Sequence, residues 1–184
     1  MLLLEEKDRF AYGLEGEKAV ADYIRKFGWN VRINEVGKDG CEPKHNLIGG
    51  DIYIEWQNTR AHPTNPIERQ KWLKLDVKRG TFIAQKSLEH FQGQFYCLIP
   101  KGDITDIENA RIIRRGTILS YIKDIPSEKY IIGPSGDKGL RFGRIKKYMI
   151  LKDFVTHLVK LRLLNADFTS KEFWSKHMTF DMVE

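Results

Sequence analysis

Two short stretches decide the fold of this chain: Leu73-Lys74-Leu75-Asp76-Val77-Lys78 and, before it, Gly50-Asp51-Ile52-Tyr53-Ile54-Glu55-Trp56. Apolar and polar residues alternate in both, and this period of two is typical of a β-strand with two different faces. The alternation puts Asp76 and Lys78 on one face, about 7 Å apart along the strand. Asp51 lies on the polar face of the earlier strand. Because Asp is a poor strand former, one in each of two adjacent strands suggests a role other than stability.

The segments around these strands predict an α/β order of helix, three strands, helix and strand. Residues 8–27 show the spacing of an amphipathic helix that Gly28 ends, and residues 29–35 alternate as a strand. Loops are expected over 37–50 and 57–72. Further expected elements are a helix near 84–91, a strand over 95–99, a strand over 110–114, a helical turn over 116–122, strand material over 140–151 and a helix over 152–164.

Glu17 interrupts the apolar stripe of the first predicted helix. The stripe runs through Phe10, Leu14, Ala21 and Ile24, and position 17 falls on it. A carboxylate that faces a core is costly unless a partner satisfies it. Two interpretations follow from the pattern: Glu17 reaches water at the rim of the stripe, or it belongs to a site with Asp51 and Asp76.

The overall composition limits the class of protein. A chain of 184 residues with 41% hydrophobic residues can form one domain with its own core. No apolar run approaches the roughly 20 residues of a membrane helix, so no membrane association and a cytoplasmic location are expected. Two cysteines, Cys41 and Cys97, exclude a framework of several disulfides.

Positive charge is concentrated in the second half of the chain. Residues 1–100 carry 15 Lys and Arg against 14 Asp and Glu, whereas residues 101–184 carry 16 against 11. The densest stretch is 138–147, and its candidate nucleic-acid contacts are Arg141, Arg144, Lys146 and Lys147. An ordinary solvated strand and turn has the same composition, so the charge permits a polyanionic partner without requiring one.

The motifs together resemble the PD-(D/E)XK nuclease superfamily. The likeness lies in Glu17 on the first helix, in Gly50-Asp51, and in Asp76-Val77-Lys78. The segment from Gly13 to Glu17 also resembles the first helix of Holliday-junction resolvases and related small nucleases. Gly50 stands where the family often has Pro. The resemblance covers residues 8–100 and implies a restriction-endonuclease-like αβββαβ core with a mixed central sheet.

The resemblance also implies a function and a set of site residues. The chain is then a Mg²⁺-dependent DNA endonuclease, with Mn²⁺ as a substitute, that hydrolyses phosphodiester bonds. Asp51, Asp76 and the Val77 carbonyl are the implied metal ligands, and Glu17 joins through water or a second ion. Lys78 is implied to orient the attacking water. Lys74, Arg79 and Lys86 are further candidate contacts to nucleic acid near the cleft.

Several alternatives remain open from the sequence. Residues 1–100 are expected to form the nuclease-like core, and residues 101–184 an α+β extension packed on it. A nuclease fold that binds nucleic acid without cutting it fits the same motifs, and so does a basic α/β interaction domain whose Asp76–Lys78 pair lies on the surface. Branched, duplex and end-directed DNA substrates, RNA, and a homodimer are all compatible with the pattern.

Overall fold

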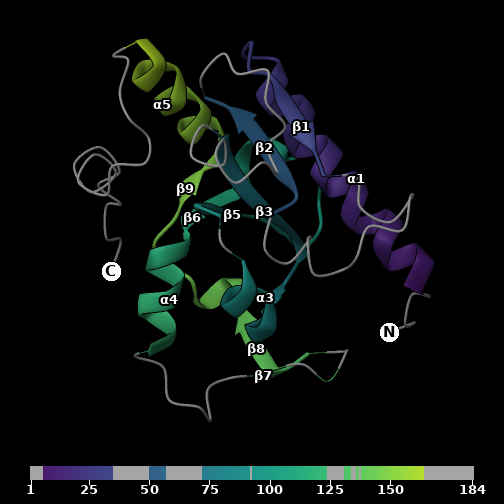
Figure 1. Ribbon diagram of the computed structural model, residues 1–184. Helices are drawn as coiled ribbons and strands as arrows, with labels where there is room; N and C mark the ends of the chain where they lie inside the picture. Colours follow the sequence, from purple (N-terminus) through teal and green to yellow (C-terminus); the bar gives the residue numbers. More distant parts are fainter. Residues whose placement is uncertain are drawn as a thin grey trace.

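A mixed six-stranded sheet forms the centre of this α/β chain (Figure 1). The computed structural model describes residues 6–34, 50–56, 72–91, 93–123, 131–133, 136 and 138–163. In spatial order the strands are β1 (Val31–Ile33), β2 (Ile52–Glu55), β3 (Trp72–Gly80), β5 (Phe95–Pro100), β6 (Arg111–Arg114) and β9 (Met149–Ile150). The β3–β5 pair is parallel, and the other neighbours are antiparallel.

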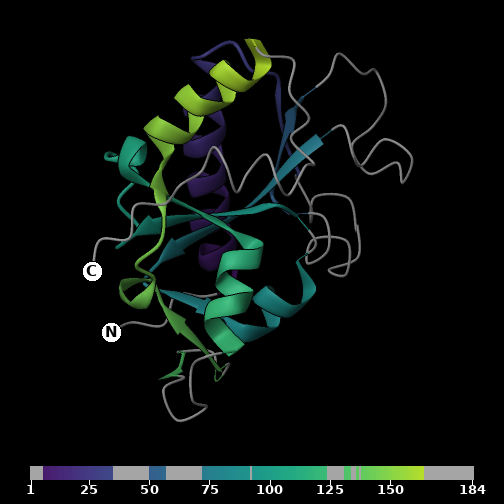
Figure 2. The ribbon, with the colours of Figure 1, turned by 90° about the vertical axis from the view of Figure 1, so that its left-hand side faces the viewer.

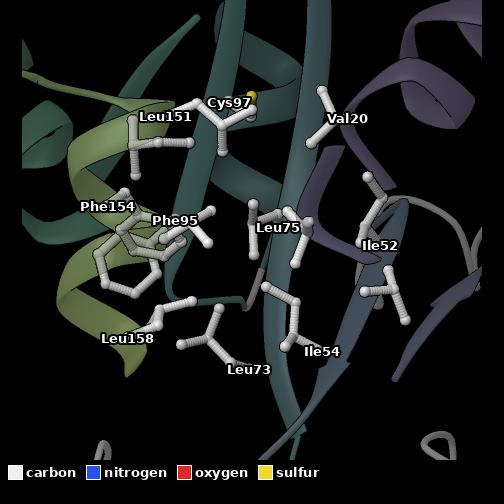
Figure 3. Close-up of a cluster of buried hydrophobic side chains, with 14 of the residues drawn as sticks. Val20, Ile52, Ile54, Leu73, Leu75, Phe95, Cys97, Leu151, Phe154 and Leu158 are labelled. Atoms are coloured by element: carbon white, nitrogen blue, oxygen red, sulfur yellow. The ribbon is translucent and has the colours of Figure 1, made fainter. Parts of the chain in front are cut away.

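One face of the sheet packs against helices α1 (Glu6–Arg25) and α5 (Leu151–Leu163). Val20, Ala21 and Ile24 of α1 are fully buried, as the helical spacing predicts. The main apolar cluster joins them to alternate residues of the strands, and Figure 3 shows Leu73 and Leu75 at its centre. This cluster supplies the apolar burial that holds α1 against the sheet.

The opposite face carries a second apolar cluster and a small sheet. The small sheet has the order β4 (Phe82–Ala84), β8 (Lys138–Arg141) and β7 (Ile131–Ile132). Helices α3 (Gln85–His90) and α4 (Arg115–Lys123) pack beside it, together with the short 3-10 turn η4 (Phe142–Arg144). Tyr96 and Leu98 of β5 belong to this cluster, while Phe95 and Cys97 belong to the first one. The small sheet lies at the end of the molecule opposite α5 (Figures 1 and 2).

The observed order follows the sequence prediction over the first hundred residues. Helix α1, strands β1 to β3, helix α3 and strand β5 occur in the expected sequence, with shifts of a few residues at their ends. Strand β4 was not expected: Phe82 and Ile83 lie between the predicted strand and the predicted helix, and Ala84 falls at the start of that helix. The predicted loops over 37–50 and 57–72 fall outside the described residues, apart from Gly50 and Trp72.

The prediction of strand material over 140–151 needs a correction. This stretch is not one strand: β8 pairs with β4 in the small sheet, whereas β9 pairs with β6 in the main sheet. The turn η4 and residues 145–148 connect the two sheets. The chain must change direction here, because each strand satisfies its backbone hydrogen bonds in a different sheet.

Residues beyond 100 complete the main sheet rather than only covering it. Strands β6 and β9 occupy one side of it, and Phe154, Val155 and Leu158 of α5 are fully buried in the main cluster. The 3-10 turn η2 (Ile107–Asn109) lies between β5 and β6. Among the described residues, none of the helices combines the length and the apolar character that crossing a membrane requires.

Candidate active site

The polar face of β3 is buried, contrary to the surface interpretation of its Asp and Lys residues. Residues 72–77 are all buried, and burial decreases only from Lys78 onward. Within the described part of the chain, Lys74 and Asp76 are the two charged residues in the buried class, with 7% and 4% of their area exposed. A buried charge needs a partner or it costs several kcal/mol, so the contacts of Asp76 are decisive.

Asp76 receives a hydrogen bond on each of its carboxylate oxygens. The Lys78 ammonium, two residues further along β3, donates to Oδ1 at 2.8 Å. The Ser87 hydroxyl of α3 donates to Oδ2 at 3.1 Å. The Asp76–Lys78 pair is therefore a partly buried ion pair, with 6% of the aspartate and 28% of the lysine side chain exposed. Such a pair is not the weak surface contact that the alternation alone allows.

Asp51 lies directly beside this pair, just before β2 begins. Its main-chain N–H donates to the Leu75 carbonyl at 2.9 Å, and its Oδ2 accepts the Val77 N–H at 2.7 Å. The same Oδ2 lies 3.9 Å from the Lys78 ammonium. Ile52, opposite Leu75, is the last β2 residue that pairs with β3 in the direction of Val77. Beyond it, the Asp51 side chain accepts the Val77 N–H in place of a strand partner.

Gly50 explains how the chain turns into this arrangement. Its φ of +82° lies in the left-handed region, and a Cβ there would come within 2.8 Å of Phe91 and 2.9 Å of the Leu75 carbonyl oxygen. A proline, fixed near φ −65°, cannot adopt this conformation. The glycine is therefore a requirement of this backbone.

Glu17 is brought to the site by the close approach of α1 to the sheet. A Cβ on the preceding Gly16 would lie 3.1 Å from the Ile99 side chain and 3.2 Å from that of Arg79, so a glycine lets the helix lie against β3 and β5. Glu17 is partly buried and interacts electrostatically with Asp76 and Lys78. The structure therefore brings Glu17, Asp51, Asp76 and Lys78 together.

The charges at this site perturb one another. Burial raises the pKa of Glu17 from 4.5 to about 7; Lys78 opposes the rise and Asp76 adds to it. Burial, followed by Asp76, raises the pKa of Asp51 well above its usual value. Burial alone would lower the pKa of Lys78, but the carboxylates of Asp76 and Asp51 outweigh it and raise that pKa. Three acids thus share one cationic partner, a condition that a bound cation relieves.

The donor set fits a hard divalent cation. Asp51 and Asp76 supply carboxylate oxygens, and the Val77 carbonyl points to the same side of β3 as the N–H that Asp51 binds. Among the residues that the structure describes, no three Asp, Glu, His or Cys side chains form a ready-made metal cluster. The Lys78 ammonium contacts both aspartates instead, so it is the counter-ion of the pair in this structure.

The predicted nucleic-acid contacts of the basic stretch lie on the surface. Arg141, Arg144, Lys146 and Lys147 are exposed, and so is Lys138, whereas Leu140, Phe142 and Ile145 between them are buried in the second cluster. This alternation directs the cations outward from the small sheet and η4. Contact with nucleic acid stays a prediction for these residues.

The three candidates nearer the cleft have different surroundings. Lys86 is exposed on α3. The Lys74 ammonium is buried and lies 5.8 Å from the centre of the Tyr53 ring. Arg79 is turned towards α1: it donates to the Tyr12 and Gly102 carbonyls at 2.9 and 2.8 Å and pairs with a carboxylate of that helix. These contacts give Arg79 a role in packing, and its contact with nucleic acid stays a prediction.

Ser87 is a site residue that sequence reasoning missed. It lies on α3 beside Leu88 and one helical turn before Phe91, which are both buried. A polar residue on an apolar stripe is the signal that singled out Glu17, but α3 has only six residues and gives little periodicity. Tyr96 is fully buried, as expected for a core tyrosine, and its hydroxyl donates to the Ser87 carbonyl at 3.1 Å.

The chain matches no protein-family model, and it matches no curated protein.

Proposed function

We propose that this chain is a metal-dependent DNA endonuclease with a restriction-endonuclease-like fold. The observation that carries the proposal is the convergence of Asp51, Asp76 and Lys78, with Glu17 facing them from α1. Two carboxylates, a lysine and a further acid are the groups that metal-assisted phosphodiester hydrolysis uses. The burial of Asp76 and the partial burial of the other three, at a cost in free energy, support a functional role over a structural one.

The order of elements supports the same proposal. Helix α1, strands β1 to β3, helix α3 and strand β5 match the αβββαβ order of the superfamily, with β4 as an addition. The parallel β3–β5 pair in an otherwise antiparallel sheet gives the mixed character expected of that core. Asp51 lies just before β2, and Asp76 and Lys78 lie on β3 where β2 no longer pairs with it. This placement supports the proposal.

Each residue then has a defined part in hydrolysis. Asp51, Asp76 and the Val77 carbonyl would hold Mg²⁺ or Mn²⁺, and Glu17 would bind through a water molecule or a second ion. When bound, the ion would supply positive charge at the phosphate and lower the pKa of a water molecule. Lys78 would then leave its contact with the aspartates, orient the attacking water and stabilise the negative charge that develops on the phosphate oxygens.

DNA is the proposed substrate because the exposed cations suit a phosphate backbone. Arg141, Lys146 and Lys147 project from the small sheet and the segment that follows it, on the same side of the main sheet as α3. α3 in turn contacts Asp76 through Ser87. A duplex or branched DNA held on this basic surface would lie near the carboxylates.

A cleavage assay tests the proposal directly. The purified chain is incubated with linear, nicked and branched DNA in the presence of Mg²⁺, Mn²⁺ or a chelator. We expect cleavage with either ion and none with the chelator. The Asp76→Asn variant should cut no substrate, because the neutral amide is a poor ligand for a hard cation.

A matched control variant distinguishes the loss of a site residue from the general effect of removing one negative charge. Asp22→Asn removes an exposed carboxylate from α1, where it pairs with Arg25 on the surface. It should cleave like the wild type. DNA binding without cleavage under all ion conditions would instead favour the alternative of a nuclease fold that only binds nucleic acid.

A further inference from the structure

We infer that Ser87 is a positioning residue of the proposed metal site, acting through Asp76 and held in place by Tyr96. This inference rests on the proposed function, because it assigns a part in that function to a residue outside the superfamily motif. It starts from two hydrogen bonds, one from the Ser87 hydroxyl to Asp76 and one from Tyr96 to the Ser87 carbonyl.

The first step concerns the orientation of the Asp76 carboxylate. An ionised carboxylate only accepts hydrogen bonds, and it can rotate about its bond to Cβ unless its oxygens are held separately. Ser87 holds Oδ2 from α3, and Lys78 holds Oδ1 from β3. Oδ1 is thereby kept on the side of Lys78 and Asp51. When Lys78 moves to act on water, the Ser87 bond still fixes the carboxylate.

The second step concerns the rigidity of Ser87 itself. Its carbonyl accepts hydrogen bonds from the Tyr96 hydroxyl and from the Phe91 N–H, each at 3.1 Å. The Phe91 and Tyr96 rings also pack edge to face with their centres 4.8 Å apart. Both rings are buried, so α3 is anchored on β5 next to the strand that carries Asp76. The Ser87 hydroxyl is therefore held in a fixed position relative to Asp76.

Such an outer residue has a characteristic effect on a metal site. Groups that orient a ligand typically change metal affinity or activity by about 10- to 100-fold when they are removed. Ser87→Ala should therefore weaken Mn²⁺ binding and lower the cleavage rate by about this factor. DNA binding measured in chelator should not change, because Ser87 acts on the carboxylate and not on the DNA.

The experiment combines Mn²⁺ calorimetry with an NMR measurement on the metal-free chain. In Ser87→Ala, the chemical shift of the Asp76 side-chain carboxyl carbon should change even without metal, because the hydrogen bond is lost. Ser87→Thr keeps a hydroxyl and should restore most of the Mn²⁺ affinity. Tyr96→Phe keeps the ring and removes only the hydrogen bond from its hydroxyl to the Ser87 carbonyl. It should therefore lower the Mn²⁺ affinity less than Ser87→Ala does. Ser120→Ala, on the exposed side of α4, is the matched control and should behave as the wild type.

The outcomes separate this inference from the proposed function. In one outcome the wild type binds Mn²⁺ and cuts DNA, while Ser87→Ala binds Mn²⁺ equally well and leaves the Asp76 chemical shift unchanged. The role inferred for Ser87 is then wrong, and the nuclease proposal is unaffected. If the wild type neither binds Mn²⁺ nor cuts DNA, the nuclease proposal is wrong, and the positioning role is lost with it. A loss of thermal stability in Ser87→Ala that Ser87→Thr repairs, with no change in Mn²⁺ affinity, overturns the inference in favour of a purely structural bond.

Discussion

The two faces of β3 are both buried as far as Val77, but they are chemically opposite. On one face, Leu75 and its apolar neighbours lie in the main cluster against α1 and α5 (Figure 3). On the other face, Asp76 and Lys78 form an ion pair that Asp51 and Ser87 complete. Six consecutive residues of this strand are buried, so exposure to water does not explain the charges.

The difference shows which face supports the fold and which one depends on it. Apolar burial contributes about 25 cal/mol per Å², whereas each buried ion loses several kcal/mol of hydration that its partners recover only in part. The raised pKa values of Glu17 and Asp51, caused first by burial, show that their ionised forms are disfavoured in the folded chain. The apolar face therefore stabilises the fold, whereas the polar face lowers the stability of the fold and forms the site.

The largest expected effect comes from removing a carboxylate from the polar face. Asp51→Asn keeps the shape, and its side-chain oxygen can still accept the Val77 N–H. Cleavage should fall by more than about 100-fold, the upper end of what outer residues of a metal site cause. The free energy of unfolding should be unchanged or higher, because the repulsion from Asp76 disappears. Urea unfolding alongside the cleavage assay checks both statements, and a strongly destabilised variant would contradict the division between the faces.

The complementary change on the apolar face should affect stability first. Leu75→Ala leaves a cavity in the main cluster and should lower the free energy of unfolding by about 2 to 5 kcal/mol. Leu163→Ala removes a leucine side chain that is 81% exposed at the end of α5, and it should have almost no effect. Urea unfolding of the two variants measures the contrast. Equal losses would mean that Leu75 is not at the centre of the core.

Alternation along the chain made most of the main sheet predictable. β2, β3 and β5 were found because their residues alternate or form an apolar run with a clear end at Pro100. β4 and β7 were missed because two or three residues carry no measurable period. The change of sheet between β8 and β9 was missed for a different reason. Strand propensity does not tell which partner a strand pairs with, and that depends on contacts distant in sequence.

The site was predictable where a polar residue interrupts an apolar pattern. Glu17 has this property, whereas Asp76 was found because Asp is a poor strand former. The structure brings both together with Asp51 and Lys78. Ser87 was not predictable, because the helix that carries it is too short to show a stripe. The packing role of Arg79 was also hidden, since its partners on α1 are more than sixty residues away in sequence.

A smaller effect of the polar face should appear in the pH dependence of the free energy of unfolding. The pKa of Glu17 is about 7 in the folded chain against an ordinary value of 4.5. Between these pH values the folded chain retains a proton that the unfolded chain has released, so the free energy of unfolding falls as the pH rises. Glu17→Gln should flatten this fall, although Asp51 contributes a slope in the same direction.

Urea unfolding in chelator, from below pH 4.5 to above pH 7, measures this dependence. Glu89→Gln, an exposed substitution on α3, is the control and should keep the slope of the wild type. A slope that Glu17→Gln leaves unchanged would mean that Glu17 reaches water at the rim of the helix.

The smallest expected effect concerns the basic surface beyond the polar face. If Lys147 contacts a phosphate of duplex DNA, Lys147→Gln should reduce the slope of log affinity against log salt by about 0.9, because one fewer counter-ion is released. Arg141→Gln, Arg144→Gln and Lys146→Gln should do the same wherever the side chain makes such a contact. Lys160→Gln removes an exposed charge from α5, at the opposite end of the molecule from the small sheet, and should leave the slope unchanged (Figures 1 and 2). Fluorescence anisotropy with labelled duplex in chelator gives these slopes without cleavage. An unchanged slope in all four variants would make the basic stretch an ordinary solvated surface and leave DNA contact to Lys74 and Lys86.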